Sequence, residues 1–227
     1  MNVPTSRVQQ VISLIVKEWR VEWRRRYALN GLVLYLVSTI FICYLSFNVR
    51  VNQMEPLTWN TLFWIILLFS AVNAIAKSFM QESPGRLLYY YSVFSPQVLI
   101  IARLIYNSLL MLFLAIAGLL IYSIVLGNPV GDMLYFFFAV ILGSVGFSVT
   151  FTMISAIAAK AGNNQTLMAV LGFPIVLPML LMVIKLSRNA LDGLDRSASS
   201  DELLTLLAIN ILVGAVSFLL FPYLWRT

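Results

Sequence analysis

Histidine is absent from the sequence, and cysteine occurs only once, at Cys43. The missing histidine removes the commonest side-chain ligand of metals and heme, and also the usual proton carrier near neutral pH. The sequence also lacks a G-x-x-x-x-G-K-S/T stretch, so it cannot bind ATP in the manner of a P-loop protein. Any activity driven by ATP would therefore need a separate subunit.

Charged residues are also scarce, at 11% of the 227 residues, whereas 61% of the residues are hydrophobic. A soluble globular domain carries about 25% charged residues. The mean hydropathy of +0.91 agrees with a protein that lies in a membrane. The alternative, a large soluble core of helices, is disfavoured because such helices should each show a polar face.

Six long apolar segments contain most of the hydrophobic residues. A membrane-spanning helix needs about 20 residues, with a range of roughly 17–25, and the longest segment fits if it is tilted. The sequence therefore predicts an all-α polytopic membrane protein with a single transmembrane domain over residues 1–227. The predicted spans are 29–47, 57–76, 104–126, 133–158, 167–184 and 203–223.

Every charged residue lies outside these six predicted spans. A charged side chain at the centre of a membrane helix costs roughly 2.5–3.5 kcal/mol on insertion scales, so its exclusion supports the boundaries. Proton-coupled and ion-coupled transporters usually keep an ionisable residue at mid-membrane. The sequence therefore predicts that the energy for any transport comes from outside these spans.

The basic residues are unevenly distributed between the two sides that six spans would create. Eleven lysines and arginines lie on the side of the two termini, and four lie on the opposite side. The positive-inside rule then places both termini in the cytoplasm, in a multi-pass protein of the cytoplasmic (inner) membrane. The net charge of +6 is accordingly interpreted as topology and contact with anionic lipids, not as nucleic-acid binding.

The segment before the first span has the helical periodicity of an amphipathic helix, predicted over 7–26. One side carries Val8, Val11, Ile12, Ile15, Trp19 and Trp23, and the other carries Lys17, Glu18, Arg20 and Arg24. Tryptophans suit the headgroup layer, so we predict a helix that lies along the cytoplasmic membrane surface. A partly ordered basic tail is the alternative. The predicted membrane-surface anchors are Trp19, Trp23, Arg24, Arg25 and Arg26.

The longest predicted cytoplasmic connection is residues 77–103, "KSFMQESPGRLLYYYSVFSPQVLIIAR". A Pro84-Gly85 turn begins an aromatic and mildly basic stretch, and Ser95-Pro96 starts the next helix. Exposed aromatic residues at such a surface usually contact a partner, so residues 82–94 are predicted to dock a cytoplasmic partner. The alternative is that the tyrosines only anchor the loop at the interface. The predicted partner-binding residues are Glu82, Gly85, Arg86, Leu87, Leu88, Tyr89 and Tyr90.

The compositions of two later segments predict how their helices pack and bend. Residues 142–162, "LGSVGFSVTFTMISAIAAKAG", are rich in small residues, which predicts close packing against other helices in lipid. Pro174 and Pro178 lie four residues apart in the fifth span and predict a kink there. The kink could serve gating or only shape.

Three stretches together are similar to one family of membrane proteins. Residues 16–30, "VKEWRVEWRRRYALN", are a basic segment that leads into the first span. Residues 81–105 combine an acidic residue, a glycine, a leucine-rich stretch and a Ser-Pro turn. Residues 142–181 join the small-residue span, a basic turn and the proline-containing fifth span. In these features the chain resembles type-2 ABC exporter permeases, and more narrowly the heme exporter protein B (CcmB) family of the cytochrome c maturation complex.

The resemblance implies a non-catalytic, permease-like subunit of an ABC complex. The implied partners are a CcmA-like ATPase, CcmC-like and CcmD-like membrane subunits, and a second copy of this chain. ATP would bind the ATPase subunit, and heme would be handled by the complex. Without histidine, a heme iron on this chain could be ligated only by Cys43, a methionine or a tyrosine, so a mechanical role is favoured over heme ligation. Hydrolysis would help to release a heme-loaded chaperone, CcmE. The aromatic "YYYSVF" stands where the family more often has aliphatic residues and proline, which leaves the details of docking open.

Three other functions stay open at this point. An ABC exporter permease for a lipid, a drug or a glycan would be distinguished by the subunits that co-purify with it. A membrane-embedded enzyme would need clustered acidic, histidine or serine residues, and "LDGLDR" at 191–196 is only a fragment of an Asp-rich phosphotransferase motif. A passive assembly scaffold would have no ATPase partner.

Overall fold

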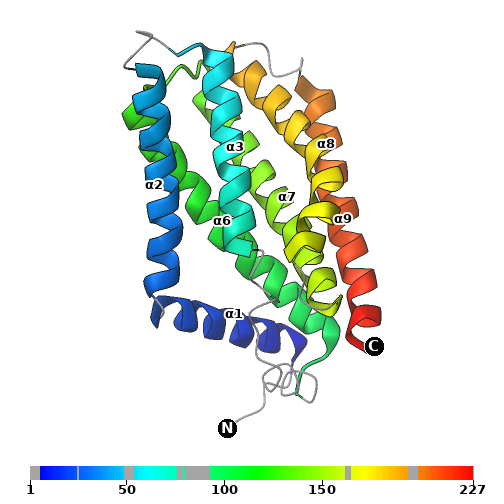
Figure 1. The fold of residues 1–227 in the computed structure, drawn as a ribbon. Coiled ribbons are helices and arrows are strands. Elements are labelled where there is room, and N and C mark those ends of the chain that lie inside the picture. Colours follow the sequence, from blue (N-terminus) through cyan, green and yellow to red (C-terminus); the bar gives the residue numbers. More distant parts are fainter. Residues whose placement is uncertain are drawn as a thin grey trace.

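The computed structural model describes residues 6–24, 26–48, 54–75, 79, 93–161, 165–193 and 199–226. Within these residues the regular structure is helical, as the sequence predicts, and the helices form one elongated bundle (Figure 1). The helices are α1 (Arg7–Arg24), α2 (Arg26–Asn48), α3 (Pro56–Ile75), α6 (Pro96–Leu126), α7 (Met133–Lys160), α8 (Gln165–Leu191) and α9 (Ser200–Arg226).

Six helices of the described chain, α2 to α9, are long and apolar enough to cross a membrane, which confirms an all-α polytopic membrane protein. The first apolar span is Leu29–Phe47, as the hydropathy pattern predicts. The third span differs most, because the apolar helix runs from Pro96 to Leu126 and not from residue 104, while the predicted helix start at Ser95-Pro96 is confirmed. Proline is favoured at the first position of a helix, where its missing N–H is not needed. The helix therefore includes Arg103, which the sequence analysis assigned to the preceding loop.

The small α1 helix lies across one end of the bundle, while the six long helices run between its two ends (Figure 1). The carboxyl terminus lies at that same end. We name the end that carries α1 and the carboxyl terminus the proximal end, and the opposite end the distal end. The even number of long helices brings both termini to one side, as the predicted topology requires.

Helix α7 is the central element of the bundle, because 67% of its most apolar part is buried, against 11% for both α2 and α9. Its small residues allow this, because they let neighbouring backbones approach closely. A Cβ atom on Gly143 would lie 2.5 Å from the ring of Trp64, and one on Gly146 would lie 2.6 Å from the sulfur of Met179. The prediction that this small-residue segment lies in a helix interface is confirmed.

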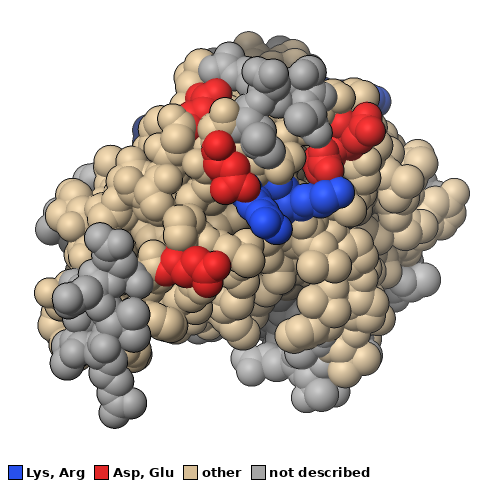
Figure 2. Space-filling model, turned by 90° about the horizontal axis from the view of Figure 1, so that it is seen from above, with Lys and Arg blue, Asp and Glu red and all other residues tan. Residues whose placement is uncertain are grey.

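Helix α8 continues through both Pro174 and Pro178 without a break in its helical assignment. The kink predicted there stays a prediction. Seen from the distal end, the molecule presents acidic side chains around a smaller basic patch (Figure 2). The described charged residues near this end are Glu55, Asp132, Lys185, Arg188, Asp192, Asp201 and Glu202.

Candidate functional site at the proximal end

Arg103 is the charged residue that the sequence analysis placed wrongly. It lies in the second turn of α6 and is only 6% exposed, inside a helix that belongs to the apolar spans. Counting back about 20 residues from Leu126, the length that crosses the hydrocarbon, reaches Asn107. Because α6 runs obliquely to its neighbours (Figure 1), it needs more residues than an upright helix. Arg103 therefore lies at the edge of the hydrocarbon layer and not at its centre.

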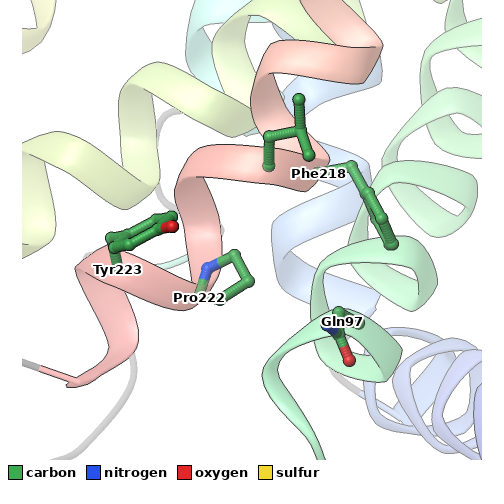
Figure 3. Close-up of a pocket in the computed structure, with 5 residues that line it drawn as sticks. Gln97, Phe218, Pro222 and Tyr223 are labelled. Carbon is green, nitrogen blue, oxygen red and sulfur yellow. The ribbon is translucent and has the colours of Figure 1, made fainter.

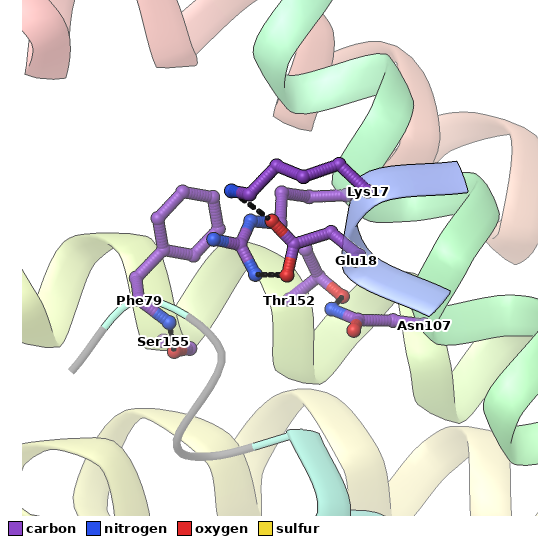
Figure 4. Close-up of polar contacts among 7 residues, drawn as sticks. Lys17, Glu18, Phe79, Asn107, Thr152 and Ser155 are labelled. Atoms are coloured by element: carbon purple, nitrogen blue, oxygen red, sulfur yellow. Dashed lines mark hydrogen bonds and ion pairs between the residues drawn. The ribbon is translucent and has the colours of Figure 1, made fainter. Parts of the chain in front are cut away.

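The charge of Arg103 is balanced by α1. Its guanidinium Nη1 lies 3.4 Å from Oε2 of Glu18, and Glu18 also accepts a 2.9 Å hydrogen bond from Lys17 Nζ (Figure 4). The sequence analysis placed Glu18 on the water-facing side of the amphipathic helix, and this was wrong. Glu18 turns toward the bundle because a buried arginine needs a compensating charge.

This ion pair is well shielded from water, with side-chain exposures of 7% for Arg103 and 15% for Glu18. Removing one partner of a buried pair leaves an uncompensated charge and costs roughly 3–5 kcal/mol. The same pair need not raise overall stability above that of an apolar contact. Its main physical consequence is that α1 and α6 are held in one relative position.

Phe79 is the third member of this arrangement. Its ring lies beneath the Arg103 guanidinium, with 5.5 Å between the guanidinium carbon and the ring centroid, which is a cation–π distance. Its backbone N–H donates to Ser155 Oγ on α7 at 3.2 Å, and its ring packs on Phe221 of α9 at 5.5 Å between centroids. Phe79, which follows α3 in the sequence, therefore contacts three helices: α6, α7 and α9.

A small hydrophobic cluster surrounds these polar contacts and is separate from the main core. It draws residues from α1, from the position of Phe79, and from the proximal parts of α6, α7 and α9. Its buried members are Leu14, Phe79, Val98, Leu99, Ile100, Ala102, Ala156 and Phe221. We name this cluster, together with Glu18, Arg103 and Ser155, the proximal junction.

A polar layer lies next to the junction, between α6 and α7. Asn107 Nδ2 donates to Thr152 Oγ1 at 2.8 Å, and Ser108 Oγ lies 3.2 Å from Ser148 Oγ (Figure 4 shows the first pair). Both contacts join short side chains of neighbouring helices. Such bonds satisfy polar groups that lipid would leave without a partner.

Helix α1 has three faces, where the sequence analysis assumed two. Leu14 and Glu18 face the bundle, while Ser13 and Arg20 face outward with the other polar residues. A third face carries apolar side chains that stay exposed on the protein surface, including Trp19 at 49% exposure. The exposed apolar residues of α1 are Val8, Ile12, Val16 and Trp19.

The predicted anchor residues are therefore only partly placed by the structure. Trp19 lies on the exposed apolar face, as a residue in contact with lipid would, and Arg24 is exposed at the end of α1. The side chains of Trp23 and Arg26, and all of Arg25, lie outside the described residues.

Replacing Trp19 with aspartate should weaken the attachment of α1 to the membrane surface. The change removes a large apolar side chain, whose burial contributes roughly 1.5–3 kcal/mol, and puts a charge toward the acyl boundary. The fraction of a tagged 1–28 fragment that binds anionic vesicles, and assembly of the full chain, should both fall. Ser13→Asp on the outward polar face is the matched control and should change neither. A cysteine at residue 10 that reacts only from the external side would contradict the topology.

The predicted docking residues Glu82, Gly85, Arg86, Leu87, Leu88, Tyr89 and Tyr90 all lie outside the described residues. The structure does describe both flanks of that segment. Phe79 precedes it within the proximal junction, and Pro96 begins α6 after it. Arg103 is the functional candidate that sequence reasoning missed, although the Ser95-Pro96 helix start was a signal that the helix begins before residue 104.

The comparison with known protein families decides the assignment. The model of the CcmB protein family matches residues 9–222, nearly the whole chain, from α1 to the last turns of α9. The chain belongs to the CcmB family. A search of the curated proteins and a search of the solved structures each find no match.

As a CcmB-family protein, the chain is a membrane permease subunit of a heme exporter ABC complex, which acts in cytochrome c biogenesis. Membership implies a complex with an ATPase and other membrane subunits. The six apolar helices agree with a multi-pass membrane protein. The matched range includes every residue of the proximal junction, so the junction belongs to the family domain and not to an added segment.

A groove near the junction is the other feature of this CcmB-family subunit at its proximal end. Gln97 of α6 faces Phe218, Pro222 and Tyr223 of α9 across a hollow of about 230 Å³ (Figure 3). Ligand pockets for drug-sized molecules usually measure roughly 300–1,000 Å³. Among the described residues of its lining, Tyr223 is the one possible iron ligand, and it is largely exposed. The groove therefore does not have the size or enclosure of a heme site.

Proposed function

We propose that this subunit transmits force from a separate, CcmA-like ATPase to the membrane part of the complex. The force would enter through residues 82–94 and would help to release the heme-loaded chaperone CcmE. This proposal goes beyond family membership, because it assigns the chain a mechanical role and names the segment on which the ATPase acts.

The proximal junction is the observation that supports this role most. Phe79 contacts Arg103 of α6, Ser155 of α7 and Phe221 of α9, and Arg103 in turn holds Glu18 of α1. In the sequence, residues 82–94 lie between Phe79 and Pro96, the first residue of α6. A displacement of that segment would therefore act directly on α1, α6, α7 and α9, through contacts that are buried and partly ionic.

The orientation in the membrane follows from the basic residues and the position of α1. We propose that the proximal end faces the cytoplasm and that both termini lie there, in the cytoplasmic (inner) membrane. The excess of lysine and arginine on this side supports this orientation. The exposed apolar face of α1 would then lie in the headgroup layer, next to anionic lipids.

The proposed partners come from the family resemblance. They are a CcmA-like ATPase, CcmC-like and CcmD-like membrane subunits, and a second copy of this chain. ATP is proposed to bind only the ATPase subunit, and heme to be handled by the complex without a fixed site on this chain. The lack of histidine and the small, open groove at Tyr223 support this division of roles.

Binding of the ATPase to residues 82–94 can be tested by substitutions that reverse a charge or put a charge in place of an apolar side chain. Arg86→Glu, or Leu87→Asp combined with Leu88→Asp, should weaken co-purification of the ATPase while the six spans still insert. Aromatic and arginine residues dominate interface hot spots, and removing one can cost about 2 kcal/mol or more. Lys160→Ala at the end of α7 is the control, because Lys160 is exposed at the same end of the bundle and should matter less.

The measurement is the ratio of ATPase to this subunit after purification in mild detergent. Full retention of the ATPase by the Arg86 and Leu87/Leu88 variants, together with normal cytochrome c maturation, would rule out this docking segment. The tyrosines at 89 and 90 would then be interfacial anchors only.

A further inference from the structure

We infer that the distal ends of α3, α6, α7, α8 and α9 form one rigid unit that stays closed while the proximal end moves. We name this unit the distal cap. The inference rests on the proposed mechanical function and deepens it, since it says where the motion stops. It also implies that no cargo passes through the distal end of a single copy of this chain.

The turn between α6 and α7 is fixed to the end of α8 through backbone atoms. Gly131 N–H donates to Leu191 O at 3.2 Å, and Asp132 N–H donates to Ala190 O at 2.8 Å. A Cβ atom on residue 131 would lie 2.9 Å from Leu191 O, so glycine is needed for this close approach. The Asp132 carboxylate also accepts from Tyr135 N–H at 3.1 Å and so caps α7. Backbone bonds of this kind leave little freedom for the turn to move relative to α8.

Helix α3 is tied to the same turn and to α6. Trp59 Nε1 donates to Gly127 O at 3.0 Å, and Tyr122 OH donates to Trp59 O at 3.0 Å. The rings of Trp59 and Tyr122 also pack at 4.8 Å between centroids, with Phe63 and Phe136 against them. All four aromatic side chains are buried. Large rigid rings in one cluster cannot separate without opening a void.

A second set of bonds joins α3 to α8 in the buried interior of the bundle. Asn60 Nδ2 donates to Ile184 O at 2.9 Å, Trp64 Nε1 donates to Ser187 Oγ at 2.7 Å, and Ser187 Oγ lies 2.8 Å from Asn60 Oδ1. All three side chains are fully buried. The buried surroundings offer no other partner, so a small separation of α3 from α8 would leave these polar groups unsatisfied together.

Helix α9 begins in contact with this assembly. Asn189 Nδ2 donates to Ser199 Oγ at 2.7 Å, and Lys185 pairs with Glu202 at 2.8 Å between Nζ and Oε1. At the proximal end the Phe79 N–H also donates to Ser155 and its ring packs on Phe221, but α1 is joined to α6 by an ion pair. Arg103 and Glu18 are long side chains 3.4 Å apart, and Arg103 meets Phe79 through a ring face. The long Arg103 and Glu18 side chains can follow a displacement by changing rotamer, whereas the backbone bonds and packed rings of the distal cap break when their helices separate.

Two engineered disulfides test the inference in the assembled complex, in a Cys43→Ala background. Asn60→Cys with Ser187→Cys joins α3 to α8 in the distal cap. Asn107→Cys with Thr152→Cys joins α6 to α7 beside the proximal junction. The pairs are matched, since each replaces a buried asparagine and a hydroxyl residue whose side-chain atoms lie 2.8 Å apart. Asn189→Cys with Ser199→Cys is a second distal pair, in case loss of the Asn60 bonds prevents folding.

Cytochrome c maturation is measured with the pairs reduced and oxidised, as heme-stained cytochrome c. Oxidising a distal pair should leave maturation as in its reduced form. Oxidising the proximal pair should lower it by roughly 5–150-fold, the range that coupling between sites produces, and reduction should restore it. Loss of maturation on oxidising either distal pair would overturn the inference, and so would full maturation with the proximal pair oxidised.

Measurements on the same samples show whether the rigid-cap inference or the docking proposal has failed. ATPase co-purification is measured with each oxidised pair and with Arg86→Glu. If Arg86→Glu keeps its ATPase, the docking segment is wrong, but the contrast between distal and proximal pairs still decides whether the cap is rigid. If both distal pairs abolish maturation while the ATPase stays bound, the cap moves and the docking proposal stands.

Discussion

Replacing Arg103 with glutamate should abolish cytochrome c maturation, because it puts two carboxylates together in the proximal junction. Arg103 is 6% exposed and its guanidinium lies 3.4 Å from Glu18. Breaking a buried ion pair costs roughly 3–5 kcal/mol, and the repulsion adds to that cost. The expected result is an inserted chain in which α1 is detached from α6.

The exchange variant, Arg103→Glu with Glu18→Arg, gives this prediction its control. It restores opposite charges across the same two helices and should recover a measurable part of the lost maturation. Lys17→Ala should have a small effect, because Lys17 is 38% exposed and such pairs contribute about 1 kcal/mol or less. Maturation is measured together with protease accessibility of α1. Normal maturation in the single variant, or an exchange variant no better than it, would exclude the ion pair from coupling.

Replacing Gly143 with valine should cause the largest loss of folded protein among the variants considered. A Cβ atom there would lie 2.5 Å from the Trp64 ring and 3.0 Å from Val183. The ring cannot turn away, since it is fully buried and its Nε1 donates to Ser187. Overpacking a tight interface costs about 1–3 kcal/mol, and α7 contacts several other spans at this level.

Gly31→Val is the matched control for this prediction, because no atom lies within 4 Å of a Cβ at Gly31 on α2. The yield of monodisperse protein in detergent and its unfolding temperature should fall for Gly143→Val and stay unchanged for Gly31→Val. Equal behaviour of the two variants would show that α7 is not packed as described here.

The spans and the central position of α7 could be predicted from the sequence for simple physical reasons. A spanning helix must be apolar over about 20 residues whatever it packs against, so hydropathy alone locates it. Glycine, serine and alanine in 142–162 indicated close packing, because only small side chains allow it in lipid. Neither signal says which helices are neighbours.

The proximal junction could not be predicted in the same way. The third span was expected to begin after Arg103, because an isolated charge in a membrane helix is costly. That cost is met by Glu18, 85 residues earlier in the sequence, and by the ring of Phe79. A pairing over such a separation leaves no local pattern. The start of the helix at Pro96 was the better guide, since it depends only on local backbone chemistry.

The faces of α1 show a related limit. Its apolar residues were assigned to one side, but Val11 and Ile15 pack against the junction while Val8, Ile12 and Trp19 lie exposed on another face. A helix at the edge of a membrane protein has apolar neighbours of two kinds, lipid and protein. Periodicity shows that a residue avoids water, but it does not distinguish these two environments.

The most direct test of the account is a distance measurement between spin labels in the assembled complex, with and without a non-hydrolysable ATP analogue. One pair of labels, at Ser13 on α1 and Lys160 at the end of α7, reports on the proximal junction. A second pair, at Leu57 on α3 and Asp201 on α9, reports on the distal cap; all four residues are exposed. The account predicts that nucleotide shifts the Ser13–Lys160 distance and leaves the Leu57–Asp201 distance unchanged. A proximal distance that does not respond to nucleotide, in a complex whose ATPase is bound and active, would contradict it.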